Sequence, residues 1–383
     1  MQIKQKTIPK NWCVKKIEDV LNYERPDKYI VKSTHYSKNF KVPVLTANKS
    51  FVLGYTNEDS GIYEDLPVII FDDFTTARRY VDFSFKIKSS AIKILKPKDK
   101  SVNLKFIHEL MNIINFTIGN HKRYYISEYQ KIDIILPPPE EQEKIVEILE
   151  TVDKEIENVN EVIKKNEKMK KGLMKELLTK GIGHKKFKDT ELGNIPENWG
   201  IERLGKIVKI RSGDTPSGFD FNDGNYPFFK VDDMNYSLKY LNKSKLYFTN
   251  YRKPLMQKGM VVFPKRGAAI YTNKVRILNT SGYFDTNIMG ITGKEIFNEF
   301  LYYFILYIGL EKFADTTSIP QINNKHIEPI KIALPGMKEQ KQIAEILTSV
   351  DDKIQINKKL KNKLTKFKKG LMQDLLTGKV RVK

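Results

Sequence analysis

The sequence predicts an α+β protein with two similar globular domains, each followed by a long helix. Three observations predict this architecture. The stretch from Leu136 to Lys180 returns 198 positions later as Leu334 to Gly378, which indicates an internal duplication. Each copy combines a short strand with a long helical pattern. A segment of short alternating apolar runs precedes each copy, so the repeating unit is a whole domain with its helix.

Length and composition restrict the class of protein. With 383 residues the chain exceeds one ordinary hydrophobic core, so we expect at least two domains. The single cysteine, Cys13, excludes an internal disulfide, and the lysine-bearing N-terminus shows no signal peptide, so a cytoplasmic location is expected. The longest apolar run, Phe300 to Leu310, falls short of the roughly 20 residues of a membrane span. No membrane partner is expected.

The net charge of +21 suggests an anionic partner. Most of this charge lies in two segments, with +7 between Glu161 and Lys188 and +10 between Lys353 and Lys383. Both segments include the second half of a predicted long helix. Two interpretations stay open: a solvated lysine-rich helix face, or helix halves that run beside a phosphate backbone or an acidic partner subunit.

Each globular half opens with the same short motif, Ile8 to Trp12 in the first and Ile195 to Trp199 in the second. Short apolar runs separated by Gly, Pro and Asn follow, as is typical of strands and turns. The strongest strand candidates are Leu66 to Phe71 and Gly259 to Phe263, each followed by a polar or basic loop.

Each half also carries an amphipathic helix before its long helix. Apolar residues at helical spacing predict these helices over Leu104 to Ile114 and Phe297 to Ile308. Burial in a core explains such stripes without a cofactor.

The long helices begin after Pro139 and Pro335, because a helix interior does not accept proline. Their apolar residues step by three and four, as in a coiled coil. We expect the second seam to lose register at polar Asn357 and to resume at Leu360. A helix of about 39 residues is roughly 58 Å long, which suits a spacer. The predicted seam residues are Leu149, Val152, Ile156, Val159, Ile163, Leu347, Val350, Ile354, Leu364, Phe367 and Leu371.

Motifs of catalysis are missing from the sequence. There is no P-loop, and no glycine-rich turn or Asn/Asp-Pro-Pro-aromatic loop of a methyltransferase. Two acid pairs, Asp72-Asp73 and Asp232-Asp233, leave a metal-dependent nuclease open as one alternative. The histidines are scattered and unpaired with cysteines, so no zinc site is expected: His35, His108, His121, His184 and His326.

The order of variable domain, long helix, variable domain and long helix resembles the specificity (S) subunit of type I restriction-modification enzymes. The resemblance covers the whole chain. The first half departs from the pattern, because it lacks a Gly-x-Thr-Pro segment near Asn22 to Pro26 and has His121-Lys122-Arg123 where the second half has Ile319-Pro320-Gln321. The most specific motifs are the Ile-Pro-x-x-Trp openings, Ser212 to Ser217, Ser318 to Gln321, the Pro-rich Glu-Gln segments and the closing Gly-Leu-Met-x-x-Leu-Leu-Thr at 172–179 and 370–377.

The resemblance implies a division of labour along the chain. Residues 1–135 form target recognition domain 1, 136–180 the first spacer helix, 181–333 recognition domain 2 with the linker leading into it, and 334–383 the second spacer helix with the C-terminal tail. Each recognition domain reads one half of a split site in double-stranded DNA. The helices pack antiparallel, because the second must return from the far end of the first. A spacer of roughly 58 Å limits the outer spacing to about 17 base pairs.

The resemblance also implies the partners. Two modification (methyltransferase) subunits dock along the helices and, through them, restriction (translocase and endonuclease) subunits join the complex. This chain then has no catalytic residue, cofactor or metal of its own, and S-adenosylmethionine, ATP and Mg²⁺ belong to the partner subunits. A coiled-coil scaffold that binds proteins but no DNA is the second alternative.

Sequence readout needs Arg, Lys, Asn or Gln at base edges, with further basic groups on phosphates. Tyr80 and Tyr271 are expected either to stack on bases or to cover a small core. The predicted DNA-binding residues are Arg78, Arg79, Lys86, Lys88 and Arg123 in the first domain and Lys230, Lys265, Arg266, Tyr271, Lys274, Arg276 and Gln321 in the second.

Overall fold

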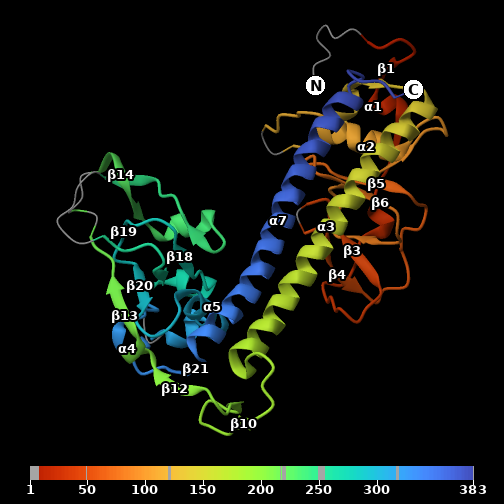
Figure 1. Cartoon of the computed structure of the whole chain (residues 1–383). Coiled ribbons are helices and arrows are strands. Elements are labelled where there is room, and N and C mark those ends of the chain that lie inside the picture. Colours follow the sequence, from red (N-terminus) through yellow and green to blue (C-terminus); the bar gives the residue numbers. More distant parts are fainter. Residues whose placement is uncertain are drawn as a thin grey trace. The chain divides into compact units, whose positions relative to one another are not determined.

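The computed structural model describes residues 8–48, 50–119, 122–215, 217, 221–248, 255–315 and 319–382. His121, Pro216 and Ser318 of the predicted motifs lie outside the described residues. The chain forms two compact units, the first with Met1–Asn158 and Leu360–Lys383, the second with Val159–Lys359. Each unit holds one globular part and one half of each long helix (Figure 1). The boundary between the units therefore crosses both helices, whereas the predicted domains keep each helix whole.

The globular part of the first unit, named domain 1, contains an antiparallel sheet in the order β2-β8-β5-β6 and a smaller sheet in the order β4-β3-β7. All five residues of the central strand β5 are buried, and β5 confirms the strand predicted there. The strands are β1 Cys13–Lys16, β2 Leu21–Glu24, β3 Val42–Leu45, β4 Val52–Thr56, β5 Val68–Asp72, β6 Arg78–Val81, β7 Lys86–Ile87, β8 Ile92–Pro97 and β9 Asp133–Leu136.

Two helices complete domain 1, α1 (Ile17–Val20) and α2 (Leu104–Ile113), and the second confirms a predicted helix. Asn103 caps α2, because its side chain accepts a hydrogen bond from the backbone N–H of Phe106 at 3.1 Å. The core contains α2 residues, Tyr125 and Tyr129, together with residues from the first turns of the long helix α3 (Pro139–Lys180) and the last turn of the long helix α7 (Met337–Leu375). Parts of both long helices thus belong to this core.

The globular part of the second unit, named domain 2, has a five-stranded sheet in the order β13-β20-β17-β18-β15 and a three-stranded sheet in the order β16-β14-β19. The elements are β10 Phe187–Lys188, β11 Ile195–Pro196, β12 Gly200–Arg203, α4 Leu204–Ile207, β13 Val208–Ser212, β14 Phe221–Phe229, β15 Tyr240–Leu241, β16 Leu246–Phe248, β17 Val261–Pro264, β18 Arg276–Leu278, β19 Tyr283–Phe284, β20 Ile288–Gly293, α5 Asn298–Ile308, α6 Asn324–Ile327 and β21 Lys331–Leu334.

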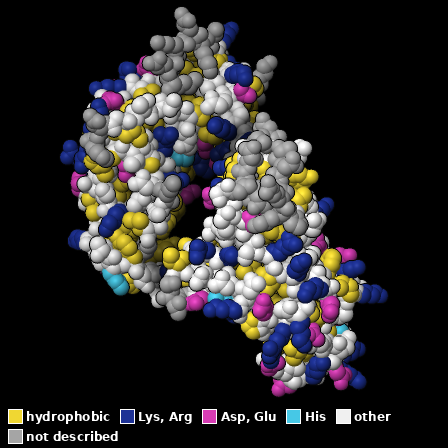
Figure 2. All heavy atoms as spheres, turned by 90° about the vertical axis from the view of Figure 1, so that its left-hand side faces the viewer, with side chains coloured by type: hydrophobic (Ala, Val, Ile, Leu, Met, Phe, Trp, Pro, Cys, Tyr) yellow, Lys and Arg dark blue, Asp and Glu magenta, His cyan; other side chains and the backbone are white. Residues whose placement is uncertain are grey.

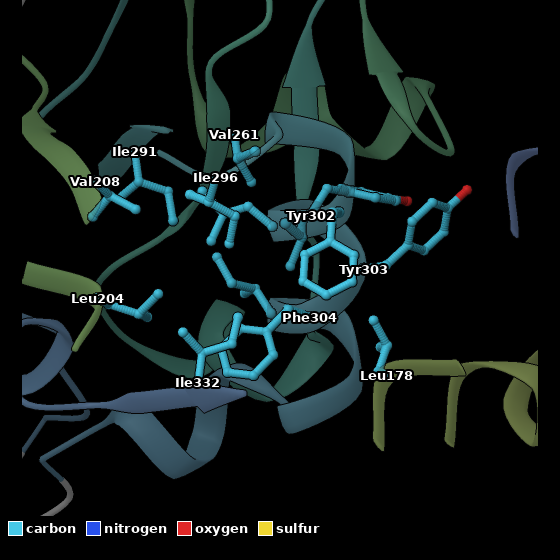
Figure 3. Packing of buried hydrophobic residues seen from close by; sticks show 14 of the residues in the cluster. Leu178, Leu204, Val208, Val261, Ile291, Ile296, Tyr302, Tyr303, Phe304 and Ile332 are labelled. Carbon is cyan, nitrogen blue, oxygen red and sulfur yellow. The ribbon is translucent and has the colours of Figure 1, made fainter. Parts of the chain in front are cut away.

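The core of domain 2 forms between its large sheet and α5. Figure 3 shows Val261 and Ile291 of this sheet at the top of the cluster and Phe304 of α5 lower down, with Ile296 between them. Leu178 of α3 belongs to the same cluster. As in domain 1, long-helix residues complete the core.

The two units repeat the same joints, which confirms the predicted duplication. An antiparallel strand pair leads into each long helix, β1 with β9 and β12 with β21. The next joint is a glutamine in the first turn of each long helix. The side-chain oxygen of Gln142 accepts a hydrogen bond from the backbone N–H of Asn103 at 2.8 Å, and that of Gln340 accepts one from Phe297 at 2.7 Å. These bonds hold α2 and α5 in equivalent places.

The long helices are α3 (Pro139–Lys180, 42 residues) and α7 (Met337–Leu375, 39 residues). In the second unit Lys170 pairs with Asp351 at 2.6 Å and Lys358 with Glu167 at 2.7 Å. Later positions on α3 thus meet earlier positions on α7, so the helices run antiparallel there. The predicted antiparallel arrangement agrees with these pairs.

Most predicted seam residues are buried, but the structure differs from the expected seam in α7. Phe367 is 56% exposed and Leu360 is 42% exposed. The predicted loss of register at Asn357 is not seen. The seam positions of α7 keep their spacing of three and four residues through Asn357, Lys361 and Lys368, which are all half-buried. The buried seam residues are Leu149, Val152, Val159, Ile163, Leu347, Val350 and Ile354, and the half-buried ones are Ile156, Leu364 and Leu371.

Ion pairs explain why lysines occupy seam positions. Lys368 donates to Asp153 at 2.6 Å in the first unit, and Lys170 pairs with Asp351 at 2.6 Å in the second. The duplication relates these pairs, because both lysines and both aspartates are 198 positions apart. A lysine stem can cover apolar surface while its ammonium group meets an acid. The spacing of three and four residues in the seam is kept because Asp153 lies opposite Lys368 and Asp351 lies opposite Lys170.

Among the described residues, no helix is long and apolar enough to span a membrane.

Candidate nucleic-acid interface

Each domain brings two loops together beyond its central strand. In domain 1 the backbone N–H of Tyr124 donates to the carbonyl oxygen of Asp73 at 2.9 Å. In domain 2 the backbone N–H of Ile322 donates to the carbonyl oxygen of Lys265 at 2.8 Å. The first loop follows β5 or β17, and the second precedes the last strand of the domain. The pair of joined loops in each domain is named the loop tip. Both tips carry predicted DNA-binding residues.

The first loop of the domain 1 tip is held by an aspartate. Oδ1 of Asp72 accepts hydrogen bonds from the backbone N–H groups of Phe74 at 3.1 Å and Thr75 at 2.9 Å. The backbone of Thr76 has a φ of 54°, which a β-branched residue rarely adopts. The hydrogen bonds to Asp72 therefore stabilise a strained turn that exposes Phe74 and Thr75.

One aspartate of each acid pair, Asp73 or Asp233, is buried and stabilises its own domain. Asp73 is buried, accepts a hydrogen bond from the N–H of Tyr125 at 2.7 Å and pairs with Lys93 at 3.5 Å. Asp233 is buried and accepts from the N–H of Lys230 at 2.8 Å. Within the part of the chain that the structure describes, no cluster of three or more His, Cys, Asp or Glu side chains is suited to a metal ion. The nuclease alternative is not favoured.

In domain 1, Arg79 and Arg123 are exposed, and each guanidinium lies over an aromatic ring, of Phe51 at 5.8 Å and Phe74 at 5.9 Å respectively. Arg78 is half-buried and donates to Tyr129 Oη at 2.9 Å and to Asn112 Oδ1 at 3.1 Å. Arg79 also donates a hydrogen bond to the carbonyl oxygen of Asn48 at 3.3 Å. Arg79 and Arg123 are both at the surface, whereas Arg78 supports the sheet.

The predicted lysines of domain 1 lie elsewhere. Lys86 is buried, and its ammonium group donates to the carbonyl oxygens of Ser60 at 2.6 Å and Gly61 at 3.2 Å and pairs with Glu58 at 3.1 Å. These contacts use its three protons, so Lys86 is not kept among the proposed DNA contacts. Lys88 is half-buried, with its ammonium group 5.7 Å from the ring centre of Tyr36.

In domain 2 the exposed candidates are Lys230, Arg266 and Tyr271, and Lys274 is half-buried. Arg266 forms an antiparallel bridge with Gln321, which places both in the loop tip.

Two further candidates of domain 2 make contacts within the domain. Lys265 donates to Ser212 Oγ at 3.0 Å, and burial, with Arg266 nearby, lowers its pKa. Arg276 donates to backbone carbonyls, of Val275 at 2.7 Å and Met234 at 2.8 Å, so it supports the fold and is not kept among the proposed contacts.

The polar residues around the arginines of domain 1 were not predicted from the sequence. An open hollow there is lined by Thr75, Asn112 and Asn115 as well as Arg78 and Arg79. The available signals were Thr75 in the loop after an apolar strand and Asn112 and Asn115 at the end of the amphipathic helix α2. Tyr80 of β6 is half-buried and lies 6.1 Å from His108 of α2, ring centre to ring centre.

Positive charge is not confined to the loop tips. Figure 2 shows Lys and Arg side chains spread over the drawn face among acidic and hydrophobic ones. On the drawn face the charge marks no single patch, so the candidate contacts are taken from the local geometry of the tips.

His108 of α2 lies behind the arginines of β6. Burial, with Arg78, Lys368 and Arg79 nearby, lowers the pKa of His108 to about 4 from its usual 6.5. Its Nδ1 is 4.0 Å from Glu109 Oε1. The neutral imidazole is thus favoured in the folded chain.

We expect domain 1 to lose stability as the pH falls from about 6.5 towards 4. In this window the unfolded chain binds a proton at His108 that the folded chain does not, so the free energy of unfolding decreases, by on the order of 3 kcal/mol in total. Denaturant titrations at pH 5 and 7, with amide hydrogen exchange in α2, measure the loss. His108→Gln should reduce the dependence on pH and exposed His35→Gln should not; equal slopes in all three proteins would contradict the prediction.

Known proteins share this organisation. A family model for the type I restriction modification DNA specificity domain matches the chain twice, over residues 9–167 and 196–366. The chain is 31% identical over 354 residues to the specificity subunit of the type I restriction enzymes EcoR124I and EcoR124II from Escherichia coli, covering 87% of this chain and 85% of that protein. It is 28% identical over 404 residues to the MjaVIII specificity subunit of Methanocaldococcus jannaschii, covering 98% and 94%.

Solved structures show the same fold. The S subunit of a type I restriction-modification system from M. genitalium superposes with a TM-score of 0.61 at 16% identity, covering 98% of both chains. A structure from work on complex assembly and conformational transition of the type I R-M system gives 0.62 at 15% identity, covering 98% of this chain and 100% of the other. The predicted α+β architecture with two repeated domains is confirmed. From the two matches of the family model and the identity along nearly the whole chain, it follows that this protein belongs to the family of type I restriction-modification DNA specificity subunits.

Proposed function

We propose that this chain is the DNA specificity subunit of a type I restriction-modification complex and reads a split double-stranded target, one half-site with each domain. The observation that supports this most is the repeated loop tip with different exposed side chains in its two copies. Equivalent geometry presents each tip to DNA in the same way, and different side chains let the half-sites differ. Catalysis, S-adenosylmethionine, ATP and Mg²⁺ belong to the partner subunits.

The proposed contacts in domain 1 are Arg79 and Arg123, with Lys88 at the margin. In domain 2 they are Lys230, Arg266, Tyr271, Lys274 and Gln321, with Lys265 behind them. Arginine and glutamine can reach base edges, whereas lysines suit phosphates. DNA affinity of the complex should therefore fall steeply with salt, as counterions are released from the phosphates.

The test is a methylation map. The chain is co-expressed with its modification subunit, and methylated adenines are located across a bacterial genome. A split motif is expected, and exchanging residues 1–135 for those of another family member should change one half of it. A motif that keeps both halves after the exchange would reject readout by domain 1. No methylation by a well-formed complex would favour the protein scaffold.

A repeated surface on the long helices supports docking of two modification subunits. On both helices two apolar residues seven positions apart are exposed, with a lysine and a glycine on the same face. The four residues on α3 and the four on α7 are 198 positions apart, as expected for the duplication. This exposed face of each helix is named the docking stripe. It comprises Val162, Lys165, Met169 and Gly172 on α3 and Leu360, Lys363, Phe367 and Gly370 on α7.

The glycines of the docking stripe indicate a close neighbour. A glycine inside a helix costs about 1 kcal/mol relative to alanine. A side chain built at Gly172 or Gly370 meets nothing within 4 Å of its Cβ among the described residues, so packing within the chain does not call for glycine. Close approach of a partner helix gives a reason for it at both positions. Two equal stripes then fit two copies of one partner.

Replacing Gly172 and Gly370 with leucine should weaken assembly with the modification subunit at least tenfold while the chain keeps its stability. Leucine favours the helix by most of the 1 kcal/mol that glycine costs, so loss of assembly would not reflect unfolding. Titration of the labelled chain with the modification subunit measures the affinity. The matched control is Lys168→Leu with Lys366→Leu, exposed positions outside the stripe. Unchanged affinity of the glycine variants would exclude the stripe as the docking surface.

A further inference from the structure

Arg123 and Gln321 occupy the same position in the two domains, although the sequence around them differs. The strand register establishes this. Asp72, the last residue of β5, pairs with Ile92 at the start of β8, and Pro264, the last residue of β17, pairs with Ile288 at the start of β20. The next residue along each strand, Asp73 or Lys265, is therefore equivalent in the two domains.

The second loop is anchored to these equivalent residues. The backbone N–H that reaches Asp73 belongs to Tyr124, and the one that reaches Lys265 belongs to Ile322. Arg123 and Gln321 each come directly before the anchored residue. The same register makes Phe74 equivalent to Arg266. Phe74 directly follows Asp73, and Arg266 directly follows Lys265, the two residues whose carbonyl oxygens accept these hydrogen bonds.

The backbone at both positions is held in place. Gln321 donates its N–H to the carbonyl oxygen of Asp315 at 3.0 Å and accepts from the N–H of Asp315 at 2.9 Å. The carbonyl oxygen of Arg123 accepts a hydrogen bond from Ser127 Oγ at 2.8 Å, and its exposed guanidinium lies over exposed Phe74. Fixed backbone and a side chain at the tip are what a base-reading residue needs, because misplacement by about 1 Å loses a bidentate bond.

We propose that Arg123 and Gln321 are equivalent base readers, so that domain 1 selects a guanine and domain 2 an adenine at corresponding positions of the two half-sites. Arginine forms two hydrogen bonds with O6 and N7 of guanine in the major groove, and glutamine forms two with N6 and N7 of adenine. This inference rests on the proposed function and adds to it the base that each position selects.

The neighbouring cations are less suited to this role. Arg78 and Arg276 donate to groups inside their domains, and Lys86 is buried. Lys122, next to Arg123, is ion-paired with Glu128. A lysine also lacks the planar fork that distinguishes guanine through two parallel bonds. Arg79 is exposed too, but it lies on β6 outside the loop tip and donates to the carbonyl oxygen of Asn48 at 3.3 Å. Within the domain 1 tip, Arg123 is thus the residue that combines exposure with a fork.

The test exchanges the two side chains. Arg123→Gln should change one G·C pair to A·T in the half-site of domain 1 and leave the other half unchanged. Gln321→Arg should change one A·T pair to G·C in the half-site of domain 2. The preference at that position should shift by about tenfold or more, as expected for one bidentate pair. Methylation maps of the complex with each variant chain show the motif, and competition binding with duplexes randomised at one position gives the preference even when methylation is weak.

Other outcomes distinguish failure of the proposed function from failure of the assignment of the two base readers. A wild-type complex without a split motif would reject the proposed function itself. A wild-type split motif that both variants retain would reject only the assignment of these readers. Equal weakening on all sequences would also reject it, because a phosphate contact behaves in that way. Lys122→Gln and Lys325→Gln, at exposed neighbouring positions, serve as controls and should keep both half-sites.

Discussion

Replacing Val350 with aspartate is expected to destabilise the second unit by about 3 to 5 kcal/mol and to abolish methylation of the split motif. Val350 is 4% exposed and lies in the unbroken seam of α7. Aspartate loses the burial of the valine and places a carboxylate in an apolar contact without a partner. Three residues earlier, Leu347 belongs to the core cluster of domain 2, so the loss reaches that core.

The matched control is Ile356→Asp on the same helix. Ile356 is exposed, so a carboxylate there stays in water. Denaturant unfolding followed by helical circular dichroism, with a methylation map of each complex, compares the two variants. Equal stability of Val350→Asp and the wild type would show that the seam does not stabilise the unit.

Replacing Trp199 with alanine is expected to cost the second unit about 3 to 5 kcal/mol, as for other buried aromatic truncations. Trp199 is 1% exposed, and its Nε1–H donates to Glu339 Oε2 at 3.0 Å. Glu339 also accepts a hydrogen bond from the N–H of Ile182 at 3.0 Å. The tryptophan thus joins the motif that opens domain 2 to the first turn of α7 and to the end of α3.

The glycine after α3 depends on the same ring. Gly181 has a φ of 68°, and a Cβ there would lie 2.7 Å from Cζ2 of Trp199. Trp199→Phe keeps most of the buried area and loses the hydrogen bond, so it should cost less than the alanine variant.

The first unit offers a matched experiment. Trp12 is buried and donates to Glu141 Oε2 at 2.9 Å, and Arg381 pairs with the same carboxylate at 2.7 Å. Amide hydrogen exchange should accelerate in α2 for Trp12→Ala and in α5 for Trp199→Ala. Equal acceleration in both helices for either variant would contradict a separate clamp in each unit.

Local pattern accounts for most of the secondary structure that was predicted. The apolar run of β5, the stripe of α2 and the proline before α3 each act within a few residues, so periodicity and turn residues are sufficient. The repeated Trp motifs and helices were enough to identify the family. The candidate site was predictable only as residue types in a loop, since exposure depends on segments far away in the chain.

Lys86 shows this limit. In the sequence Lys86 resembles a surface cation, but it begins the short strand β7, and the carbonyl groups of Ser60 and Gly61 accept hydrogen bonds from its ammonium group. Nothing in the residues next to Lys86 indicates that the loop with Ser60 and Gly61 lies against its side chain. The same holds for Arg276, whose partners include Met234, 42 positions away.

The sequence by itself determined the duplication, the extents of the long helices and the family, because these depend on identity and periodicity along the chain. Only the tertiary structure decided the register of the α7 seam and the anchoring of Arg123 and Gln321 at the two loop tips. Lys368 can enter the seam because Asp153, 215 positions away, accepts a hydrogen bond from its ammonium group, which leaves Phe367 exposed. The sequence repeat aligns Arg123 with Gln321, but only hydrogen bonds between distant loops place both residues beside the ends of β5 and β17, and no local pattern carries that information.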